Sequence, residues 1–297
     1  MSAAVLLLEL LAAPLIGAAV VTAFALSPRR GLLKALWAEL PERLGSLPPE
    51  ARARLSGKKA WWLHAASAGE VAGLEPLVAA LAARPGAPPL VVTTTTAAGK
   101  AAATKLPGVA HACLAPVDAW PFVSRFIAAL APERLVLTET ELWPTTILLA
   151  ARAGLKPALV NARMTERSFG RYRLIAPLLR PALESLTLVA TQSAPDHDRF
   201  AALGARSLVV AGNCKYDRGA VPAATTEADA RLTQLGLAGR PLFIAGSTHP
   251  GEEDAVLAAF LQARALGADL VLVLAPRHAE RAADALKSLR DGGLKPA

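Results

Sequence analysis

Apolar residues recur along this chain in short continuous runs, and most runs are followed by a stretch with helical spacing. The runs that predict buried strands are 60–65, 89–95, 111–115, 135–139, 157–161, 186–191 and 207–211. The stretches that predict helices are 71–83, 97–105, 119–130, 144–153, 170–185 and 195–203. Because Val- and Leu-rich strands that alternate with helices form parallel sheets covered on both faces, we predict an α/β, Rossmann-like domain.

The alternation breaks between 213 and 239, where Gly and Pro are frequent and only a short helix fits. A second set then begins, with a strand at 241–246, a helix at 251–265, a strand at 270–275 and a helix at 277–290. Doubly wound sheets usually have about five or six strands. We therefore expect an incomplete second domain, whose missing part is supplied elsewhere or was lost by truncation, and we favour truncation.

The N-terminal residues 3–26 are apolar apart from Glu9 and a few small residues. As a helix they would extend about 36 Å, which is enough to cross a bilayer. A cleavable signal peptide is the alternative, because Ala23–Ala25 resembles a cleavage site. The first residues carry no Lys or Arg, whereas Arg29 and Arg30 follow the run. This asymmetry favours a retained single anchor, residues 1–28, with the rest of the chain in the cytoplasm.

Positive charge is concentrated directly after the predicted anchor. The formal net charge is +8, and residues 27–60 hold eight Lys and Arg residues against three Glu. No nucleic-acid-binding motif is present, so an anionic membrane surface or an acidic lipid fits this segment better than nucleic acid. Within it, residues 30–45 place Leu and Trp at helical spacing. This pattern predicts either an interfacial amphipathic helix or a helix docked on the domain.

The stretch Trp61–Glu70, WWLHAASAGE, ends an apolar strand in small residues and delivers the first charge, Glu70, at the start of a helix. Ligands of open α/β sheets bind at this edge, and small residues allow a substrate to approach the backbone. Glu70 is therefore a candidate proton acceptor or an acidic residue that stabilises the helix N-terminus. His64, a lone histidine in the strand, is expected to be buried or hydrogen-bonded rather than a ligand.

A second stretch, Leu135–Pro144, also carries carboxylates to a strand end. Glu139 and Glu141 follow the apolar run, and Pro144 suits the first turn of the next helix. Two carboxylates here suit general base catalysis or binding of sugar hydroxyls, and an acidic helix N-terminus is the alternative. Because both stretches end strands of one parallel sheet, we expect these carboxylates and Glu70 at the same edge.

Polar residues that suit anion recognition follow further strands. They are Arg163, Lys215 (expected in a cleft between the domains), Ser247, Thr248 and His249, and Arg277, which directly follows Pro276. The two cysteines, Cys113 and Cys214, lack partners at metal-ligand spacing and are expected to be buried thiols in a reducing compartment. Neither a G-x-G-x-x-G nor a P-loop sequence occurs. We expect no metal site and no cofactor.

Seven motifs in this order resemble the 3-deoxy-D-manno-octulosonic acid (Kdo) transferases of lipid A biosynthesis. They are Ser67–Glu70, Thr93–Gly99, Glu139–Pro144, Asn161–Arg163, Gly212–Asp217, Ser247–Glu253 and Pro276–His278. The resemblance implies the GT-B fold, in which two Rossmann-like domains face each other across a cleft. It also implies metal-independent, inverting transfer of Kdo from CMP-Kdo to lipid IVA.

By this resemblance, residues 29–217 form the acceptor-binding domain at the cytoplasmic face of the inner membrane. Residues 218–297 form part of the nucleotide-sugar-binding domain. Glu70 matches the general base, Glu139 and Lys215 match transition-state stabilisers, and the pair Pro276 and Arg277 matches a CMP-contacting segment.

The family continues past residue 297 with Met-Gly-Glu and Asn-x-x-Glu segments that contact CMP, and this sequence holds neither. Two other functions therefore stay open. One is a catalytically incomplete lipid-binding fragment, and the other is an envelope GT-B glycosyltransferase with a different donor.

Overall fold

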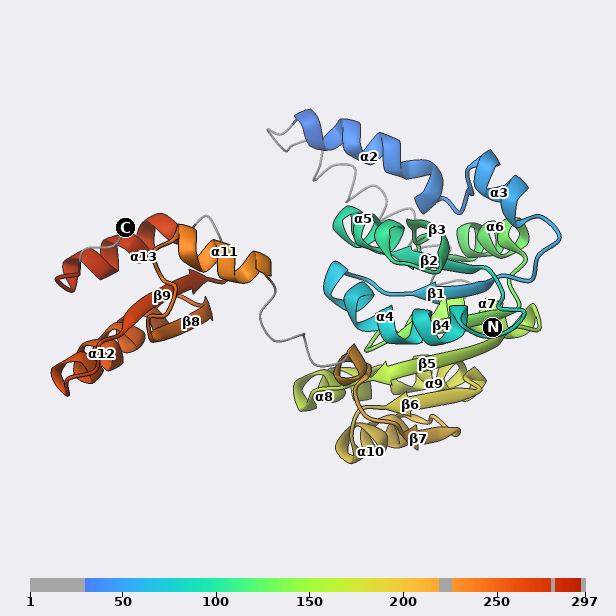
Figure 1. Ribbon diagram of the computed structural model, residues 1–297. Coiled ribbons are helices and arrows are strands. Elements are labelled where there is room, and N and C mark those ends of the chain that lie inside the picture. The colour runs from blue at the N-terminus through green and yellow to red at the C-terminus, as the bar shows by residue number, and fades with distance from the viewer. Residues whose placement is uncertain (1–29, 219–225, 279–280, 295–297) are drawn as a thin grey trace. The chain divides into compact units, whose positions relative to one another are not determined.

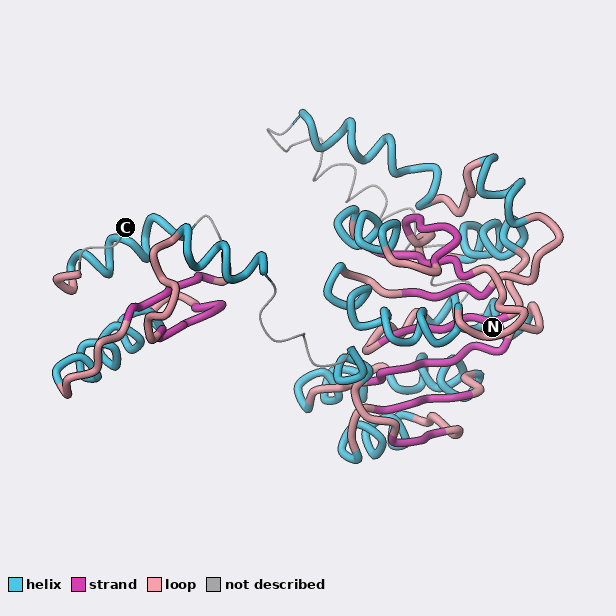
Figure 2. The backbone as a smooth tube through the Cα atoms, viewed as in Figure 1, coloured by secondary structure: helices cyan, strands magenta, loops and turns pink. Residues whose placement is uncertain are grey.

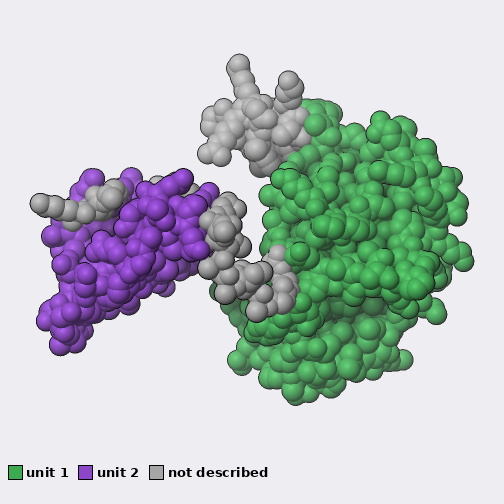
Figure 3. All heavy atoms as spheres, viewed as in Figure 1, with its two compact units in different colours: residues 1–219 green, residues 220–297 purple. Residues whose placement is uncertain are grey.

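The computed structural model describes residues 30–218, 226–278 and 281–294. The chain divides into two compact units, residues 1–219 and residues 220–297, which Figure 3 colours green and purple. Within the described residues, unit 1 contains a seven-stranded sheet and unit 2 contains a two-stranded sheet.

The sheet of unit 1 is parallel throughout, and its described strands run in the order β3-β2-β1-β4-β5-β6-β7 (Figure 2). The strands are β1 (Trp61–His64), β2 (Leu90–Thr94), β3 (Val109–Leu114), β4 (Arg134–Thr138), β5 (Lys156–Ala162), β6 (Leu188–Thr191) and β7 (Leu208–Val210). All seven predicted strands are confirmed to within two residues at each end, and so is the α/β class.

Helices cover both faces of this sheet (Figure 1). They are α2 (Arg30–Arg43), α3 (Pro49–Leu55), α4 (Ala68–Ala82), α5 (Ala97–Lys105), α6 (Trp120–Leu130), α7 (Pro144–Arg152), α8 (Glu166–Leu174), α9 (Ala176–Ser185) and α10 (Ala194–Leu203), and a 3₁₀ helix, η1 (Cys214–Arg218), follows β7. Except for α2, α3 and η1, each lies between two consecutive strands, so that every connection is a crossover.

Alternate residues of the strands enter two separate cores. Trp62, Leu135 and Leu137 pack among residues of α6, α7, α9 and α10, whereas Leu63 and Val136 pack with α4 and α5. These strand residues are at most 7% exposed. Because both faces are buried, the strands are apolar at nearly every position, and each large buried side chain contributes about 1.5–3 kcal/mol.

The structure corrects one predicted helix of unit 1. The stretch 170–185 is not continuous, since α8 ends at Leu174 and α9 begins at Ala176. Ile175 between them has φ −112° and ψ 15°. Pro177 causes the break, because its nitrogen carries no hydrogen and its ring clashes with the carbonyl four residues earlier in a continuous helix.

The C-terminal end of α2 docks on the domain. Glu42 pairs with Lys100 at 2.6 Å and accepts the Leu114 amide at 2.8 Å, while Arg43 donates to the Thr95 carbonyl. Trp37, in contrast, is 71% exposed. The docked-helix alternative therefore holds for the last turn of the predicted amphipathic segment.

The predicted anchor, residues 1–28, lies outside the described residues. Among the helices of the described ranges, none is both long and apolar enough to cross a membrane.

Unit 2 pairs β8 (Leu242–Thr248) with β9 (Val271–Pro276) in parallel, together with α11 (Thr226–Gln234), α12 (Glu252–Ala265) and α13 (Ala282–Asp291). Both predicted strands and the helix at 251–265 are confirmed. The predicted helix 277–290 begins later, at Ala282. Its first residue by prediction, Arg277, instead donates its backbone N–H to the Thr248 carbonyl and so belongs to the loop after β9.

Candidate functional site

The strand order reverses between β1 and β4. From β1 the chain moves outward through β2 and β3, and it then returns to the other side of β1 to form β4. Ligand crevices of open α/β sheets lie outside the carboxyl ends of the strands at such a reversal. The loop after β1 leads to Glu70, and the loop after β4 holds Glu139 and Glu141. The expected meeting of the two stretches at one edge is therefore confirmed.

Glu70 lies in the first turn of α4 and closes the start of that helix. Ser67, the N-cap, accepts the Glu70 backbone N–H, and the Glu70 carboxylate accepts the Ser67 hydroxyl at 3.0 Å and the Ala66 amide at 2.9 Å. These reciprocal bonds resemble a capping box. The helix-stabilising alternative is thus confirmed as a geometric fact, and the carboxylate is at the same time fixed at the sheet edge.

Burial raises the pKa of Glu70 above its ordinary value of 4.5, and the nearby charges of Glu141 and Glu139 act in the same direction. The hydrogen bonds from Ala66 and Ser67 lower the pKa without cancelling the rise. A carboxylate with a raised pKa holds a proton more tightly, which suits it to accept one from a substrate hydroxyl.

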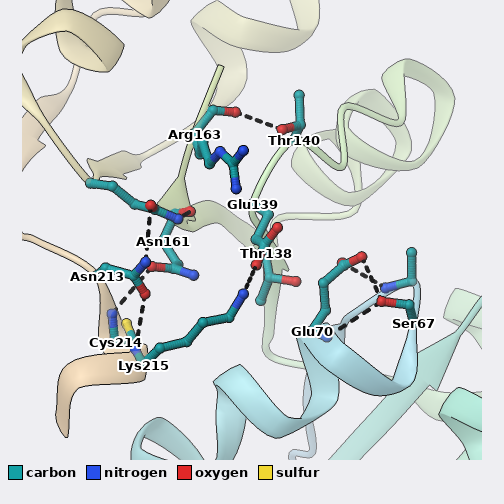
Figure 4. Close-up of polar contacts among 12 residues, drawn as sticks. Ser67, Glu70, Thr138, Glu139, Thr140, Asn161, Arg163, Asn213, Cys214 and Lys215 are labelled. Atoms are coloured by element: carbon teal, nitrogen blue, oxygen red, sulfur yellow. Dashed lines mark hydrogen bonds and ion pairs between the residues drawn. The ribbon is translucent and has the colours of Figure 1, made fainter. Parts of the chain in front are cut away.

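Lys215 lies on η1 and donates from Nζ to Glu139 Oε1 at 2.8 Å (Figure 4). Its aliphatic stem passes over α4 at Gly73, where an added Cβ would lie 3.1 Å from Lys215 Cε. Gly73 is one helical turn beyond Glu70, so the two share a face of α4. The structure therefore brings Glu70, Glu139 and Lys215 together within unit 1.

Two residues at this edge have left-handed backbone, Glu139 with φ 54° and Asn161 with φ 52°. Such φ values are uncommon for residues other than glycine and concentrate at functional sites. The Asn161 side-chain oxygen accepts the Cys214 amide at 3.2 Å, and Asn213 Oδ1 accepts the Lys215 amide at 2.9 Å. These bonds hold η1 and direct Lys215 toward Glu139.

Arg163 follows β5 and is exposed, and its carbonyl accepts the Thr140 hydroxyl at 2.6 Å. Figure 4 shows it beside Asn161 and Glu139. It borders a cavity of about 590 Å³ at the same edge of the sheet. The cavity is also lined by Gln192, Asp196, Arg199, Asn213 and Tyr216, among others. Sequence reasoning missed this cavity, because its walls come from three different strand ends.

In unit 2, the other predicted site residues also gather at the carboxyl ends of the strands. Thr248 pairs with Pro276 across the two strands, and the next residue along, Arg277, donates to the Thr248 carbonyl. Ser247 has a left-handed backbone with φ 61°, and His249 directly follows β8. These residues therefore form one cluster.

Two charged residues join the same cluster, namely Glu253, which ends the Ser247–Glu253 motif, and Arg281, which no sequence motif indicated. Arg281 Nη2 lies 3.1 Å from Glu253 Oε1, and Glu253 also accepts the Thr248 hydroxyl at 2.9 Å. Glu253 is buried, so its charge needs these two partners. Within residues 30–218, 226–278 and 281–294, no group of three or more His, Cys, Asp or Glu side chains is arranged to hold a metal ion.

Comparison with known proteins adds the family. A family model described as 3-deoxy-D-manno-octulosonic-acid transferase (kdotransferase) matches residues 38–218. The chain belongs to this family. The matched range contains the whole parallel sheet of unit 1, together with Glu70, Glu139 and Lys215. The resemblance drawn from the seven motifs is thereby confirmed.

Two curated Kdo transferases are similar over most of this chain. The 3-deoxy-D-manno-octulosonic acid transferase of Bordetella pertussis is 34% identical over 86% of this chain and 60% of its own length. The transferase of the same description from Haemophilus influenzae is 35% identical over 76% of this chain and 54% of its own length. The chain therefore spans little more than half the length of these relatives.

Solved structures share the fold at low identity. A putative UDP-N-acetylglucosamine 2-epimerase from Listeria monocytogenes has a TM-score of 0.52 at 14% identity, covering 78% of this chain and 67% of that one. A glycosyltransferase from Rickettsia africae has a TM-score of 0.52 at 10% identity, covering 80% and 66%. At these identities the likeness shows an α/β fold of the same kind.

Proposed function

We propose that this protein is a glycosyltransferase of lipopolysaccharide synthesis that transfers Kdo from CMP-Kdo to lipid IVA, with inversion and without a metal ion. The observation that carries the proposal is the arrangement of Glu70 beside the Lys215–Glu139 ion pair at the switch point of the sheet, in a member of the Kdo transferase family. Family membership supports the transferred sugar, and the site geometry supports the roles of the residues.

In this proposal Glu70 accepts the proton of the attacking acceptor hydroxyl. The hydroxyl oxygen bonds to the anomeric carbon of Kdo as the bond from that carbon to the CMP phosphate oxygen breaks. Glu139 stabilises the positive charge that develops on the sugar ring, and Lys215 stabilises the negative charge that develops on the departing phosphate. Arg163 binds a charged group of the substrate at the border of the cavity.

The proposal gives the two units different substrates. Residues 29–217 bind the lipid acceptor, and residues 218–297 supply part of the site for CMP-Kdo in a GT-B arrangement whose second domain is incomplete here. Pro276 and Arg277 contact CMP, with Ser247, Thr248 and His249 as further donor contacts. The clustering of all five residues at one strand edge supports a common ligand.

Because the proposed acceptor is a lipid, the proposed location of the protein is the cytoplasmic face of the inner membrane. In this proposal the anchor, residues 1–28, holds the protein there. Exposed Trp37 on α2 supports contact of this side of unit 1 with lipid, because large aromatic side chains favour the membrane interface. The concentration of Lys and Arg residues in 27–60 supports attraction to anionic lipid.

The test is transfer of Kdo from CMP-Kdo to lipid IVA by the full-length protein, followed by mass spectrometry of the lipid product. Glu70→Gln is expected to lower kcat by about 100-fold or more, as for loss of a general base. Glu50→Gln is the matched control, because Glu50 also lies in the first turn of a helix and is exposed on α3. Near wild-type turnover of Glu70→Gln would remove Glu70 as the base.

Two further outcomes would redirect the proposal. Transfer from a UDP-sugar in place of CMP-Kdo would identify an envelope glycosyltransferase with another donor. Binding of lipid IVA without binding of CMP would identify the chain as a catalytically incomplete lipid-binding fragment. The coverage of little more than half of the relatives' length makes the CMP measurement the first one to perform.

A further inference from the structure

His64, at the end of β1, is only 3% exposed and lies between two oxygen atoms. Its Nδ1 is 2.9 Å from the Thr93 hydroxyl, and its Nε2 is 3.5 Å from Glu141 Oε2. Nε2 is fully buried and makes no hydrogen bond to any described residue, so its approach to Glu141 is an ion-pair distance and not a formed hydrogen bond. Buried polar groups normally have hydrogen-bond partners, so a buried ring nitrogen without one that faces a carboxylate suggests a function.

Glu141 is itself fixed by its neighbours. Its Oε2 accepts the Trp143 indole N–H at 2.7 Å, and the Trp143 ring meets the His64 ring edge-on, with centroids 5.9 Å apart and planes at 89°. The Glu141 side chain is 21% exposed. The carboxylate is therefore held between an indole and an imidazole, with little freedom to turn toward solvent.

The tautomer of His64 follows from the two groups that face its ring nitrogens. The Thr93 oxygen accepts the Trp62 indole N–H at 2.8 Å, and its own proton can go to His64 Nδ1 at 2.9 Å or to the Leu63 carbonyl at 3.4 Å. When that proton goes to the nearer acceptor, Nδ1, the ring proton resides on Nε2 and faces Glu141. The opposite tautomer would direct a lone pair at a carboxylate, which is repulsive.

We propose that His64 and Glu141 are positioning residues for Glu70: Thr93 orients the His64 ring, and His64 Nε2–H attracts the Glu141 carboxylate at the sheet edge, where its negative charge strengthens Glu70 as a base. The proposal rests on the proposed function, because it assumes that Glu70 removes the acceptor proton. The Kdo transferase match of this chain assigns no role to either residue.

The groups around Glu141 come from three elements. His64 lies on β1, Glu70 on α4 and Tyr172 on α8. Burial raises the pKa of both Glu70 and Tyr172, and the charge of Glu141 raises each further. The charge of Glu141 therefore acts on the proposed base, as does that of Glu139, which is paired with Lys215.

The first experiment compares pH profiles of kcat/KM for Kdo transfer by the full-length protein and by Glu141→Gln. Gln keeps an oxygen for the Trp143 indole but carries no charge. The acid limb of the profile is expected to move to lower pH by about half a unit or more, because Glu70 loses a neighbouring negative charge. An acid limb that stays at the wild-type pH would overturn the proposal.

The second experiment separates the two ring nitrogens of His64. In His64→Gln the new side-chain amide nitrogen replaces Nε2 and can still reach Glu141, whereas His64→Asn keeps only the contact with Thr93. We expect kcat/KM of His64→Asn to fall at least about tenfold below that of His64→Gln, since only the latter retains a donor for Glu141. If kcat/KM falls equally in His64→Gln and His64→Asn, and in proportion to their loss of thermal stability, His64 has only a structural role and the proposal is overturned.

A third measurement does not depend on turnover. Imidazole nitrogen-15 spectra of the protein are expected to show a proton on His64 Nε2, and an Nε2 without a proton would contradict the proposal. If wild-type protein transfers no Kdo but His64 has the expected tautomer, the proposed function fails while the geometry stands. If Glu70→Gln is inactive and the Glu141→Gln profile is unshifted, only the positioning role fails.

Discussion

Adding a methyl group at Gly73 tests whether transfer requires the Lys215 side chain to lie where it does, across α4. It lies inside α4, and a Cβ built there would be 3.1 Å from Lys215 Cε and 3.5 Å from Lys215 Cγ. Ordinary carbon contacts begin near 3.5 Å. In Gly73→Ala the lysine stem therefore has to move by a few tenths of an ångström, which weakens the 2.8 Å contact of its ammonium with Glu139.

Stability and activity are expected to change in opposite directions in this variant. Replacing Gly by Ala inside a helix stabilises it by about 0.5–1 kcal/mol. Adjustment of the half-exposed lysine offsets only part of this gain, because the ion pair of an exposed lysine contributes about 0–1 kcal/mol. A misplacement of about 1 Å can cost about 100-fold in rate, so a smaller displacement of Lys215 predicts a loss of about three- to tenfold in kcat.

The assay measures kcat and KM for Kdo transfer, and thermal unfolding of the same preparations. Gly170→Ala is the matched control, because Gly170 also lies inside a helix, α8, and an added Cβ there meets no atom within 4 Å. Both variants are expected to gain stability, and only Gly73→Ala is expected to lose activity. If Gly73→Ala keeps the wild-type kcat and gains as much stability as the control, activity does not require this position of Lys215 and the reasoning is refuted.

Three further outcomes are expected. Lys215→Met should lower kcat about 100-fold with a stability change within about 1 kcal/mol, and Lys215→Arg should recover part of the rate, as steady-state kinetics and thermal unfolding would show. Burial raises the pKa of Glu70 in the folded protein above its ordinary value of 4.5, which applies in the unfolded chain. Wild-type protein therefore loses stability as the pH rises from the Glu70 pKa of the unfolded chain through that of the folded protein. Glu70→Gln should therefore gain stability relative to wild type across that window and keep the gain at neutral pH, measured by urea unfolding; an equal difference at all pH values would contradict this. Burial raises the pKa of the Cys113 thiol to about 12, so folded protein should protect Cys113 from a thiol reagent that labels it readily in urea.

The sheet was predictable from the sequence because its strands are buried on both faces. The strand predicted at 135–139 begins with the apolar run Leu135–Leu137, which lies between Arg134 and the polar residues Thr138 and Glu139, so its limits are clear. The helix at 170–185 was harder, because its apolar spacing continues through Ile175 and only Pro177 marks the break. The spacing of apolar residues locates helices and strands, but the break between α8 and α9 depends on the backbone nitrogen of a single proline, Pro177.

The site was predictable only as far as strand ends determine it. Parallel strands place Glu70 and Glu139 at one edge whatever their side chains do. The contact of Lys215 with Gly73 involves residues 142 positions apart, so no local pattern could indicate it. The same holds for Glu253 and Arg281, whose pairing depends on where α13 begins.

The backbone of Glu139 supports a last prediction. Its φ of 54° suits glycine, and a residue with a side chain is strained there by about 1 kcal/mol or more. The Glu139 N–H donates to the Val160 carbonyl, and its own carbonyl accepts the Arg163 amide, so neighbouring backbone holds the strained conformation. Glu139→Gly removes the strain and the carboxylate, whereas Glu139→Gln removes only the charge.

Both variants are expected to lose transferase activity alike, because Lys215 loses its ion pair in each. In urea unfolding, however, Glu139→Gly is expected to be about 1 kcal/mol more stable than Glu139→Gln, since only glycine adopts a positive φ without strain. A glycine variant less stable than the glutamine variant would show that the left-handed turn is not strained. With the expected result, the protein accepts a less stable turn at the end of β4 because that turn directs a carboxylate at Lys215.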